Sequence, residues 1–160
     1  MQNCPRYPYP MDVHPTARCA LLADPYYPVV EPVRGLLETL FEAVFVVADA
    51  RSLLEGVQRL QPSVAVLDLT VAGGDLSNLI IRLKKAGPET ALIALTVHEV
   101  QAVVESALAA GLHGVVLKRF VARDLLAAVD AVLRQETFVT AEFAASRTDR
   151  ASQLPGSPPG

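Results

Sequence analysis

The chain has 160 residues, of which 51% are hydrophobic and 19% are charged, and its formal net charge is −3. This length suits one domain with a sizeable core, and the composition is that of a globular protein rather than a disordered one. An acidic chain with few aromatic residues gives no reason to expect direct binding to nucleic acid or to a membrane surface, and no apolar run is long enough to span a bilayer.

The two ends of the chain differ from its middle. Seven of the twelve prolines lie in these ends, which show no apolar periodicity. We therefore expect a flexible Pro-rich arm over residues 1–16, one ordered domain over residues 17–145, and a disordered Pro/Gly/Ser tail over residues 146–160.

The two cysteines, Cys4 and Cys19, form no C-x-x-C pair and no zinc-ligand pattern with the histidines. Cys19 begins an apolar run, where we expect a small buried thiol. Because the chain does not begin with the pattern of a secretory signal, we expect a reducing, cytoplasmic location.

Five short apolar runs, rich in Val, Ile and Leu, recur along the middle of the chain. Continuous runs of this kind are typical of strands in a parallel sheet that is covered on both faces. The expected strands are residues 19–23, 44–48, 64–69, 91–96 and 114–118.

Between and after these runs, apolar residues recur three and four positions apart, which predicts helices with one apolar stripe toward the sheet. The expected stripes are Val33, Leu36, Leu37 and Leu40; Leu53, Leu54, Val57 and Leu60; Leu76, Leu79, Ile80 and Leu83; Val100, Val103, Val104 and Ala107; and Leu125, Leu126, Val129 and Leu133. Five consecutive βα units predict an α/β fold with an open, doubly wound, five-stranded parallel sheet, in which ligands bind beyond the carboxyl ends of the strands.

Four polar side chains stand where predicted strands end: Asp24, Asp68, Thr96 and Lys118. Each alone has an ordinary explanation, as a helix cap, a loop hydrogen bond or a solvated lysine. Together they come from separate strands and point to one edge of the sheet, which favours a charged site there. Neither the phosphate-loop pattern nor the dinucleotide pattern follows the first strand, so we do not expect a nucleotide cofactor.

Four segments in this order resemble the receiver domain of bacterial two-component response regulators. They are "RCALLADPYYPVVEPVRGLLE" (18–38), "PSVAVLDLTVAGGDL" (62–76), "ALIALTVHE" (91–99) and "ALAAGLHGVVLKR" (107–119). The similarity spans about residues 18–140. Residues 136–143 resemble the segment that leads into a helix-turn-helix output domain in larger relatives, but the chain then enters its polar tail, so we expect a stand-alone receiver.

The resemblance implies a flavodoxin-like sheet with strand order 2-1-3-4-5. It also implies that Asp68 accepts a phosphoryl group from a histidine kinase or a phosphotransfer protein, while Thr96 and Lys118 contact that group. Asp24, Asp68 and the backbone carbonyl of Thr70 would hold Mg²⁺. Such a domain is not an enzyme beyond its own aspartyl phosphorylation and dephosphorylation, and it signals to a downstream protein that the sequence does not identify.

Two positions depart from the family pattern. Pro25 stands where the family has a second acidic metal ligand, so we expect weak Mg²⁺ binding. Val115 stands where the family usually has an aromatic residue that changes position on activation. These departures leave a second hypothesis open, a degenerate receiver that binds proteins or dimerises without phosphorylation. The third hypothesis is a homodimer that forms through the fourth helix, the fifth strand and the fifth helix, because residues 102–117 are strongly apolar.

Overall fold

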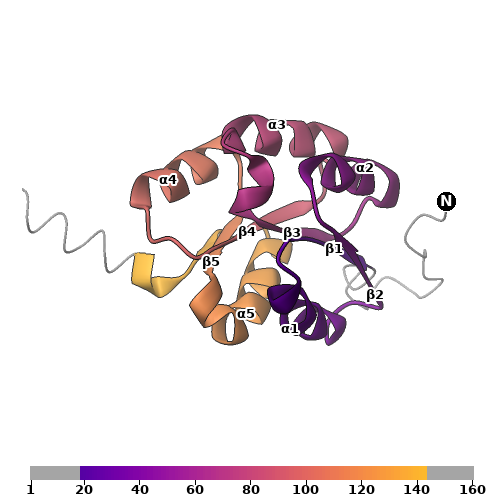
Figure 1. The fold of residues 1–160 in the computed structure, drawn as a ribbon, viewed down its shortest axis with the longest axis horizontal. Coiled ribbons are helices and arrows are strands. Elements are labelled where there is room, and N and C mark those ends of the chain that lie inside the picture. The colour runs from indigo at the N-terminus through magenta and orange to yellow at the C-terminus, as the bar shows by residue number, and fades with distance from the viewer. Residues whose placement is uncertain (1–18, 144–160) are drawn as a thin grey trace, which may run out of the picture.

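The computed structural model describes residues 19–143, and the predicted arm and tail lie outside these residues. A fully parallel sheet lies between two layers of helices (Figure 1), with strand order β2-β1-β3-β4-β5-β6. The strands are β1 (Cys19–Ala23), β2 (Ala43–Val47), β3 (Val64–Asp68), β4 (Ala91–Thr96), β5 (Gly114–Leu117) and β6 (Phe138–Val139).

The predicted α/β architecture is confirmed, and each of the five predicted strands is present within one residue of its expected bounds. The expected order 2-1-3-4-5 is extended by a sixth strand, so the prediction of five strands is wrong. β6 pairs with β5 through Gly114 opposite Phe138 and Val115 opposite Val139. Two residues are too few to show a strand period, and this is why the sequence did not reveal β6.

Helices cover both faces of the sheet (Figure 1), and α1 to α5 divide into two on one face and three on the other. α1 (Tyr27–Glu38) and α5 (Val121–Leu133) share one face. α2 (Ala50–Leu60), α3 (Leu76–Ala86) and α4 (Gln101–Ala110) share the opposite face. Because side chains alternate along a strand, Leu21 packs on the second layer and Leu22 on the first.

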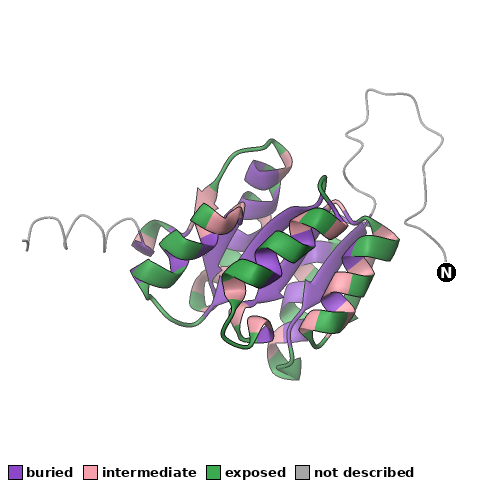
Figure 2. Cartoon of the chain, turned by 90° about the horizontal axis from the view of Figure 1, so that it is seen from above, coloured by how far each residue is buried: buried purple, intermediate pink, exposed green. Residues whose placement is uncertain are grey.

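Burial follows these layers (Figure 2), since the strands are largely buried and the outer faces of the helices are exposed. β2 differs, because it is an edge strand. Phe45 and Val46 are 38% and 39% exposed, although the apolar run had predicted burial on both faces. A run of this kind does not distinguish an edge strand from a central one.

The predicted apolar stripe of α4 is wrong in its first half. Val100 and Val103 are exposed, whereas Gln101, Val104 and Ala107 are buried. Val100 is the N-cap residue and precedes the helix. The helix therefore begins at Gln101 and turns a different set of side chains toward the sheet.

Cys19 is fully buried as expected, but it is disulfide-bonded rather than a free thiol. Between residues 19 and 143, no helix is both long enough and apolar enough to cross a membrane.

Candidate functional site

Three charged side chains meet at the carboxyl edge of the sheet. Asp24 follows β1 directly, and Asp68 is the last residue of β3. Lys118 is the first residue of the short 3-10 helix η2 (Lys118–Phe120), which follows β5. β1 and β3 are neighbours, but β4 separates β3 from β5. A long side chain such as lysine is therefore needed to reach the two carboxylates.

The ammonium of Lys118 bridges both carboxylates. Its Nζ donates to Asp24 Oδ2 at 2.9 Å and pairs with Asp68 Oδ2. Asp24 and Asp68 are only 3% and 4% exposed. Buried carboxylates repel each other and lose hydration, and the shared cation offsets part of this cost.

The second oxygen of Asp68 is held by its own loop. Oδ1 accepts the backbone N–H of Thr70 at 2.8 Å and also the Thr70 hydroxyl. Thr70 lies in the 3-10 helix η1 (Leu69–Ala72), for which Asp68 is the N-cap. Both oxygens of the Asp68 carboxylate are thus held in place, one by Lys118 and the other by Thr70.

Asp24 closes the loop that leads into α1. Its Oδ1 accepts the backbone N–H of Tyr26 at 2.8 Å, and its own N–H donates to the Val47 carbonyl at 3.1 Å. Pro25 lies between these anchors and is exposed. Proline carries neither a backbone N–H nor a carboxylate, so this position adds no acidic ligand to the site.

The charges of the cluster stabilise one another. Burial alone would raise the pKa of Asp68, but hydrogen bonds from Lys118 and Thr70 and the Lys118 charge hold it below its usual value. Burial alone would lower the pKa of Lys118, but its hydrogen bonds to Asp68 and Asp24 and their charges raise it. At neutral pH, Asp68 is therefore an anion beside a cation.

Thr96 ends β4 at the same edge of the sheet and is buried. Its hydroxyl accepts the backbone N–H of His98 at 3.1 Å and donates to the His98 carbonyl at 3.3 Å. Thr96 is therefore bonded to its own loop rather than to the charged cluster. The structure brings Asp24, Asp68 and Lys118 into contact, whereas the hydrogen bonds of the Thr96 hydroxyl go to His98.

The expected Mg²⁺ ligands are Asp24, Asp68 and the Thr70 carbonyl, and only two of them are carboxylates. Residues 19–143 contain no group of three or more His, Cys, Asp or Glu side chains that could hold a metal ion. The Thr70 carbonyl accepts the N–H of Gly73 at 3.2 Å, which leaves one of its lone pairs available. Asp24 and Asp68 together match the one or two carboxylates that proteins commonly offer to Mg²⁺, so the donor set fits this ion.

The sequence reasoning missed two features around the site. One is the bonding of Thr70 to Asp68, although an aspartate in a turn commonly accepts the backbone N–H two residues on, and only the added hydroxyl bond has no such signal. The other is a pocket of about 350 Å³ beside Asp24, lined by Asp24, Pro25, Tyr27, Val30, Glu31, Arg34, Val46, Val47 and Ala48. No single element of the sequence signals it, because α1 and the end of β2 form it jointly.

Val115, which departs from the family pattern, and Phe120, which follows Lys118 by two residues, are packing residues in the structure. Val115 is buried within β5. Phe120 is partly buried, and the guanidinium carbons of Arg119 and Arg123 lie 4.8 and 4.1 Å from the centre of its ring. These distances are those of cation–π contacts.

Solved structures similar to this chain are bacterial receivers. The isolated receiver domain of RcsB from Salmonella enterica serovar Typhimurium in the apo form is 28% identical, with a TM-score of 0.68, over 82% of this chain and 98% of that one. The non-phosphorylated receiver domain of the stress response regulator RcsB from Escherichia coli is also 28% identical, with a TM-score of 0.65, over 76% of this chain and 97% of that one.

Two further structures extend the comparison. A LuxR-family two-component response regulator from Aurantimonas sp. SI85-9A1 is 22% identical, with a TM-score of 0.75, over 84% of this chain and 98% of that one, which shows a shared fold alone. The S207C form of the Salmonella typhimurium RcsB response regulator is 26% identical, with a TM-score of 0.68, over 79% of this chain. This chain spans 65% of that longer protein.

No curated protein matches the chain. The family model described as "Response regulator receiver domain" matches residues 21–130, which is more than half of the sequence and includes Asp24, Asp68, Thr96 and Lys118. The chain therefore belongs to the response regulator receiver domain family.

Proposed function

We propose that Asp68 accepts a phosphoryl group from a histidine kinase or a phosphotransfer protein, and that the domain then signals by contact with a downstream protein. The observation that supports this most is the Asp68 carboxylate itself. It is buried at a strand end and paired with Lys118, and its pKa is below its usual value. It is therefore an ionised nucleophile beside a fixed cation, and phosphoryl transfer requires mainly this positioning and neutralisation.

In the proposed reaction, an oxygen of Asp68 forms a new bond to phosphorus as the P–N bond of a phosphohistidine donor breaks. The donor imidazole leaves with the electron pair of that bond. Lys118 remains beside the new acyl phosphate and offsets its added charge. Thr96 would contact a phosphoryl oxygen only after it releases its bonds to His98.

Mg²⁺ would be held by Asp24, Asp68 and the Thr70 carbonyl, and when bound it neutralises negative charge on the phosphoryl oxygens. We propose that this binding is weak for two reasons. Pro25 supplies no third carboxylate, and the Lys118 ammonium already offsets part of the negative charge of the two that are present. The reaction would then depend on the ammonium of Lys118 more than is usual when three acids surround the metal.

A degenerate receiver is the second candidate. The same bridge favours it, because Lys118 already gives both Asp24 and Asp68 a cationic partner without any metal. The domain would then act as a phosphorylation-independent binding module. Dimerisation through α4, β5 and α5 fits this candidate, since Val97, Val100 and Val103 are exposed apolar side chains in and before α4.

Incubation with a small acyl phosphate and Mg²⁺, followed by intact mass measurement, tests the proposal. The unmodified chain is expected to gain the mass of one phosphoryl group, and peptide mapping should place it on Asp68. Asp68→Asn should gain nothing. Asp75→Asn is the matched control, because Asp75 is an exposed helix N-cap in the following loop and asparagine also serves as a cap. No gain in the wild-type chain at any Mg²⁺ concentration would favour the degenerate receiver.

A further inference from the structure

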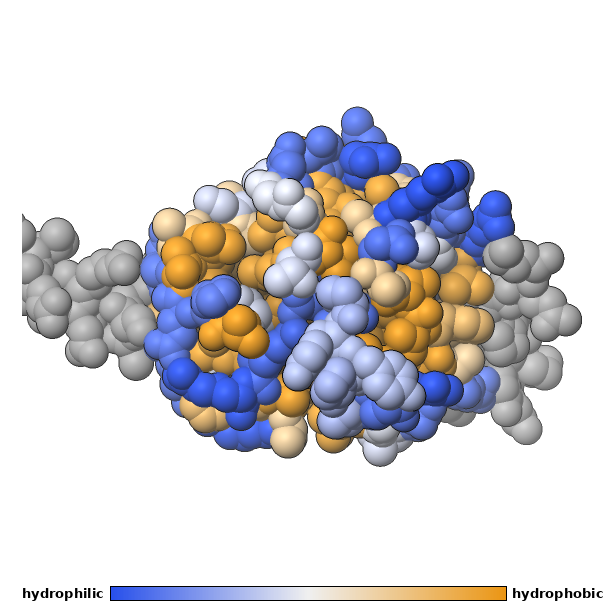
Figure 3. All heavy atoms as spheres, viewed as in Figure 1, coloured by the Kyte–Doolittle hydropathy of each residue, from blue (hydrophilic) through white to orange (hydrophobic). Residues whose placement is uncertain are grey.

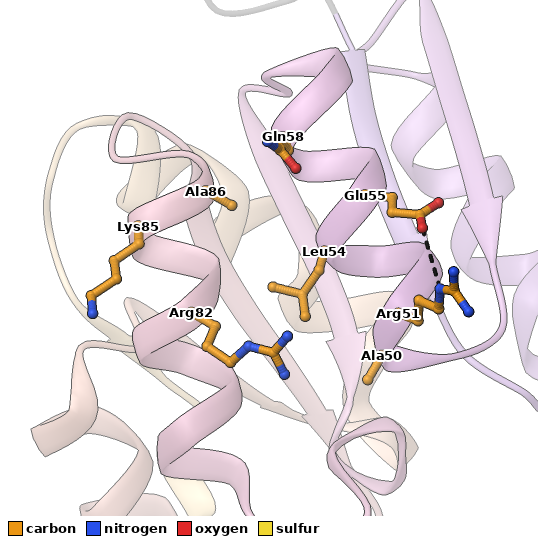
Figure 4. Close-up of a pocket in the computed structure, with 8 residues that line it drawn as sticks. All are labelled: Ala50, Arg51, Leu54, Glu55, Gln58, Arg82, Lys85 and Ala86. Atoms are coloured by element: carbon orange, nitrogen blue, oxygen red, sulfur yellow. Dashed lines mark hydrogen bonds and ion pairs between the residues drawn. The ribbon is translucent and has the colours of Figure 1, made fainter.

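A groove of about 770 Å³ runs between α2 and α3 (Figure 4). These helices lie on the face of the sheet opposite α1 and α5 (Figure 1). The groove is lined by Ala50, Arg51, Leu54, Glu55, Gln58, Arg82, Lys85 and Ala86. None of these residues belongs to the charged cluster at the strand ends, so the groove is a separate feature of the domain.

The floor of the groove is apolar. Leu54 points from α2 toward α3, while Ala50 and Ala86 leave space on either side because their side chains are short (Figure 4). Leu54 is only partly buried, so some of its surface is available to a partner. An open apolar groove between two helices suits the row of side chains along one face of a partner helix better than it suits a small molecule, which binds in an enclosed pocket.

The groove is also cationic. Arg82 extends from α3 toward Ala50 and Leu54, and Lys85 lies on the outer side of α3 (Figure 4). Neither Arg82 nor Lys85 forms an ion pair with any residue between 19 and 143. The single carboxylate of the lining, on Glu55, is already bonded to Arg51 at 3.3 Å.

This local charge opposes that of the whole chain. α2 and α3 together carry five basic side chains, Arg51, Arg59, Arg82, Lys84 and Lys85, and one acidic side chain, Glu55, in a chain of net charge −3. Hydrophilic residues gather over α3 and α2 along the upper edge of Figure 3. An approaching acidic partner is therefore attracted to these two helices more than to the rest of the described surface.

We propose that the α2–α3 groove docks an acidic amphipathic helical segment of a partner protein. Apolar side chains of the segment would pack on Ala50, Leu54 and Ala86, and a carboxylate would pair with Arg82. A guanidinium can bind a carboxylate through two parallel hydrogen bonds, and the apolar floor removes water from one side of that pair. Lys85 would add attraction at the rim of the groove.

Fluorescence anisotropy with a labelled synthetic peptide tests this proposal on the full chain. The probe is a helical peptide with leucines on one face and glutamates on the other, and its controls are the same peptide with lysine for glutamate and a scrambled sequence with no apolar face. Saturable binding is expected for the acidic amphipathic peptide alone, and binding should weaken as salt is added.

The double variant Arg82→Glu/Lys85→Glu is expected to weaken this binding by roughly tenfold or more, because both attractive charges become repulsive. Arg34→Glu/Arg134→Glu is the matched control, since it makes the same charge change at exposed residues outside the groove, on α1 and directly after α5. Circular dichroism confirms that each variant is folded. Three results would overturn the proposal. Both double variants could lose binding equally, the scrambled peptide could bind as well as the amphipathic one, or millimolar inorganic phosphate could displace the peptide.

Discussion

Lys118 connects the two buried carboxylates of the site through a single ammonium group. Replacing it with methionine, which has a similar length but no charge, leaves Asp24 and Asp68 facing each other without a cation. We expect Lys118→Met to lower the free energy of unfolding at pH 7 by about 3 kcal/mol, the usual cost of removing one partner from a buried ion pair. Urea denaturation measures this change.

Added Mg²⁺ should restore part of the stability lost in Lys118→Met, because a divalent cation can take over the neutralisation of the two carboxylates. Lys85→Met serves as the control, since Lys85 is exposed and unpaired within residues 19–143, and it should change stability by less than about 0.5 kcal/mol. A Lys118→Met domain as stable as the wild type without Mg²⁺ would contradict the proposed role of the ammonium.

We propose that Pro25 limits Mg²⁺ binding, because it supplies no carboxylate beside Asp24. Pro25→Asp adds a carboxylate next to Asp24 at an exposed position. We expect Mg²⁺ to bind about tenfold more tightly, which corresponds to about 1.4 kcal/mol. Isothermal titration calorimetry measures the dissociation constant. Pro32→Asp, on the exposed side of α1, makes the same change of residue away from the site and should leave the affinity unchanged. Unchanged affinity in Pro25→Asp would mean that position 25 does not face the metal.

Among single residues, the sequence predicted where Asp24, Asp68 and Lys118 lie because parallel strands end at the same edge of a sheet. It did not predict that Lys118 bridges both carboxylates, since this depends on how a flexible side chain crosses the end of β4. The bonds of Thr96 to His98 were also not predictable, because they depend on the rotamer of one hydroxyl and the shape of one loop.

The segment after α5 is held to the domain by Asp124. Asp124 accepts hydrogen bonds from Arg123 at 2.7 Å and from the buried Thr140 at 3.0 Å, and Arg123 also pairs with Glu142. The hydrogen bond from Arg123 lowers the pKa of Asp124, burial opposes this, and Thr140 lowers it further. The folded domain therefore favours the ionised carboxylate.

This network predicts a pH dependence of stability. Since folding lowers the pKa of Asp124, its contribution is present above the usual value of 3.8 and is lost as the pH falls through the folded value. Asp124→Asn should cost about 1 kcal/mol at pH 7, because Arg123 is half-exposed and its charge is screened. The difference from wild type should vanish in acid. Urea unfolding at several pH values tests this, with the exposed Asp130→Asn as control; a difference that persists at the lowest pH would contradict it.

α4 carries a polar residue where the helix meets the sheet. Gln101 is buried, its Nε2 donates to Glu105 at 3.1 Å, and its Oε1 has no hydrogen-bond partner among the described residues. Gln101→Met keeps a similar volume and removes the unsatisfied oxygen, so it should stabilise the domain by about 1 kcal/mol. Thermal and urea unfolding measure this. A loss of stability in Gln101→Met would contradict this prediction, because it would show that the Gln101 amide stabilises the folded domain.

The sequence predicted best those strands and helices in which several apolar residues follow the expected period. The central strands β1, β3 and β4 show continuous apolar runs, and α2 and α3 bury the stripes expected of them, with Leu53, Val57, Leu79, Ile80 and Leu83 in the core. β6 and the first turn of α4 were missed because each depends on one or two residues. Neither a two-residue strand nor the starting residue of a helix produces a period.

The alternation of strands and helices along the chain was enough to predict the parallel sheet with helices on both faces, because right-handed crossovers leave few other arrangements. It could not predict how charge is distributed over that fold. The basic groove between α2 and α3 forms only when helices separated by β3 are placed side by side. The domain thus presents two separate features, a charged cluster at the strand ends and a cationic groove on one face.

We propose that Asp68 is a working phosphoryl acceptor despite Pro25. Amide NMR spectra recorded with beryllofluoride, a mimic of the aspartyl phosphate, and Mg²⁺ test this proposal. We predict shifts centred on Asp68, Thr70, Thr96 and Lys118, as Thr96 leaves His98, and no such shifts in a folded Asp68→Asn domain. Unchanged wild-type spectra at high millimolar Mg²⁺ would contradict the claim and identify the domain as a degenerate receiver.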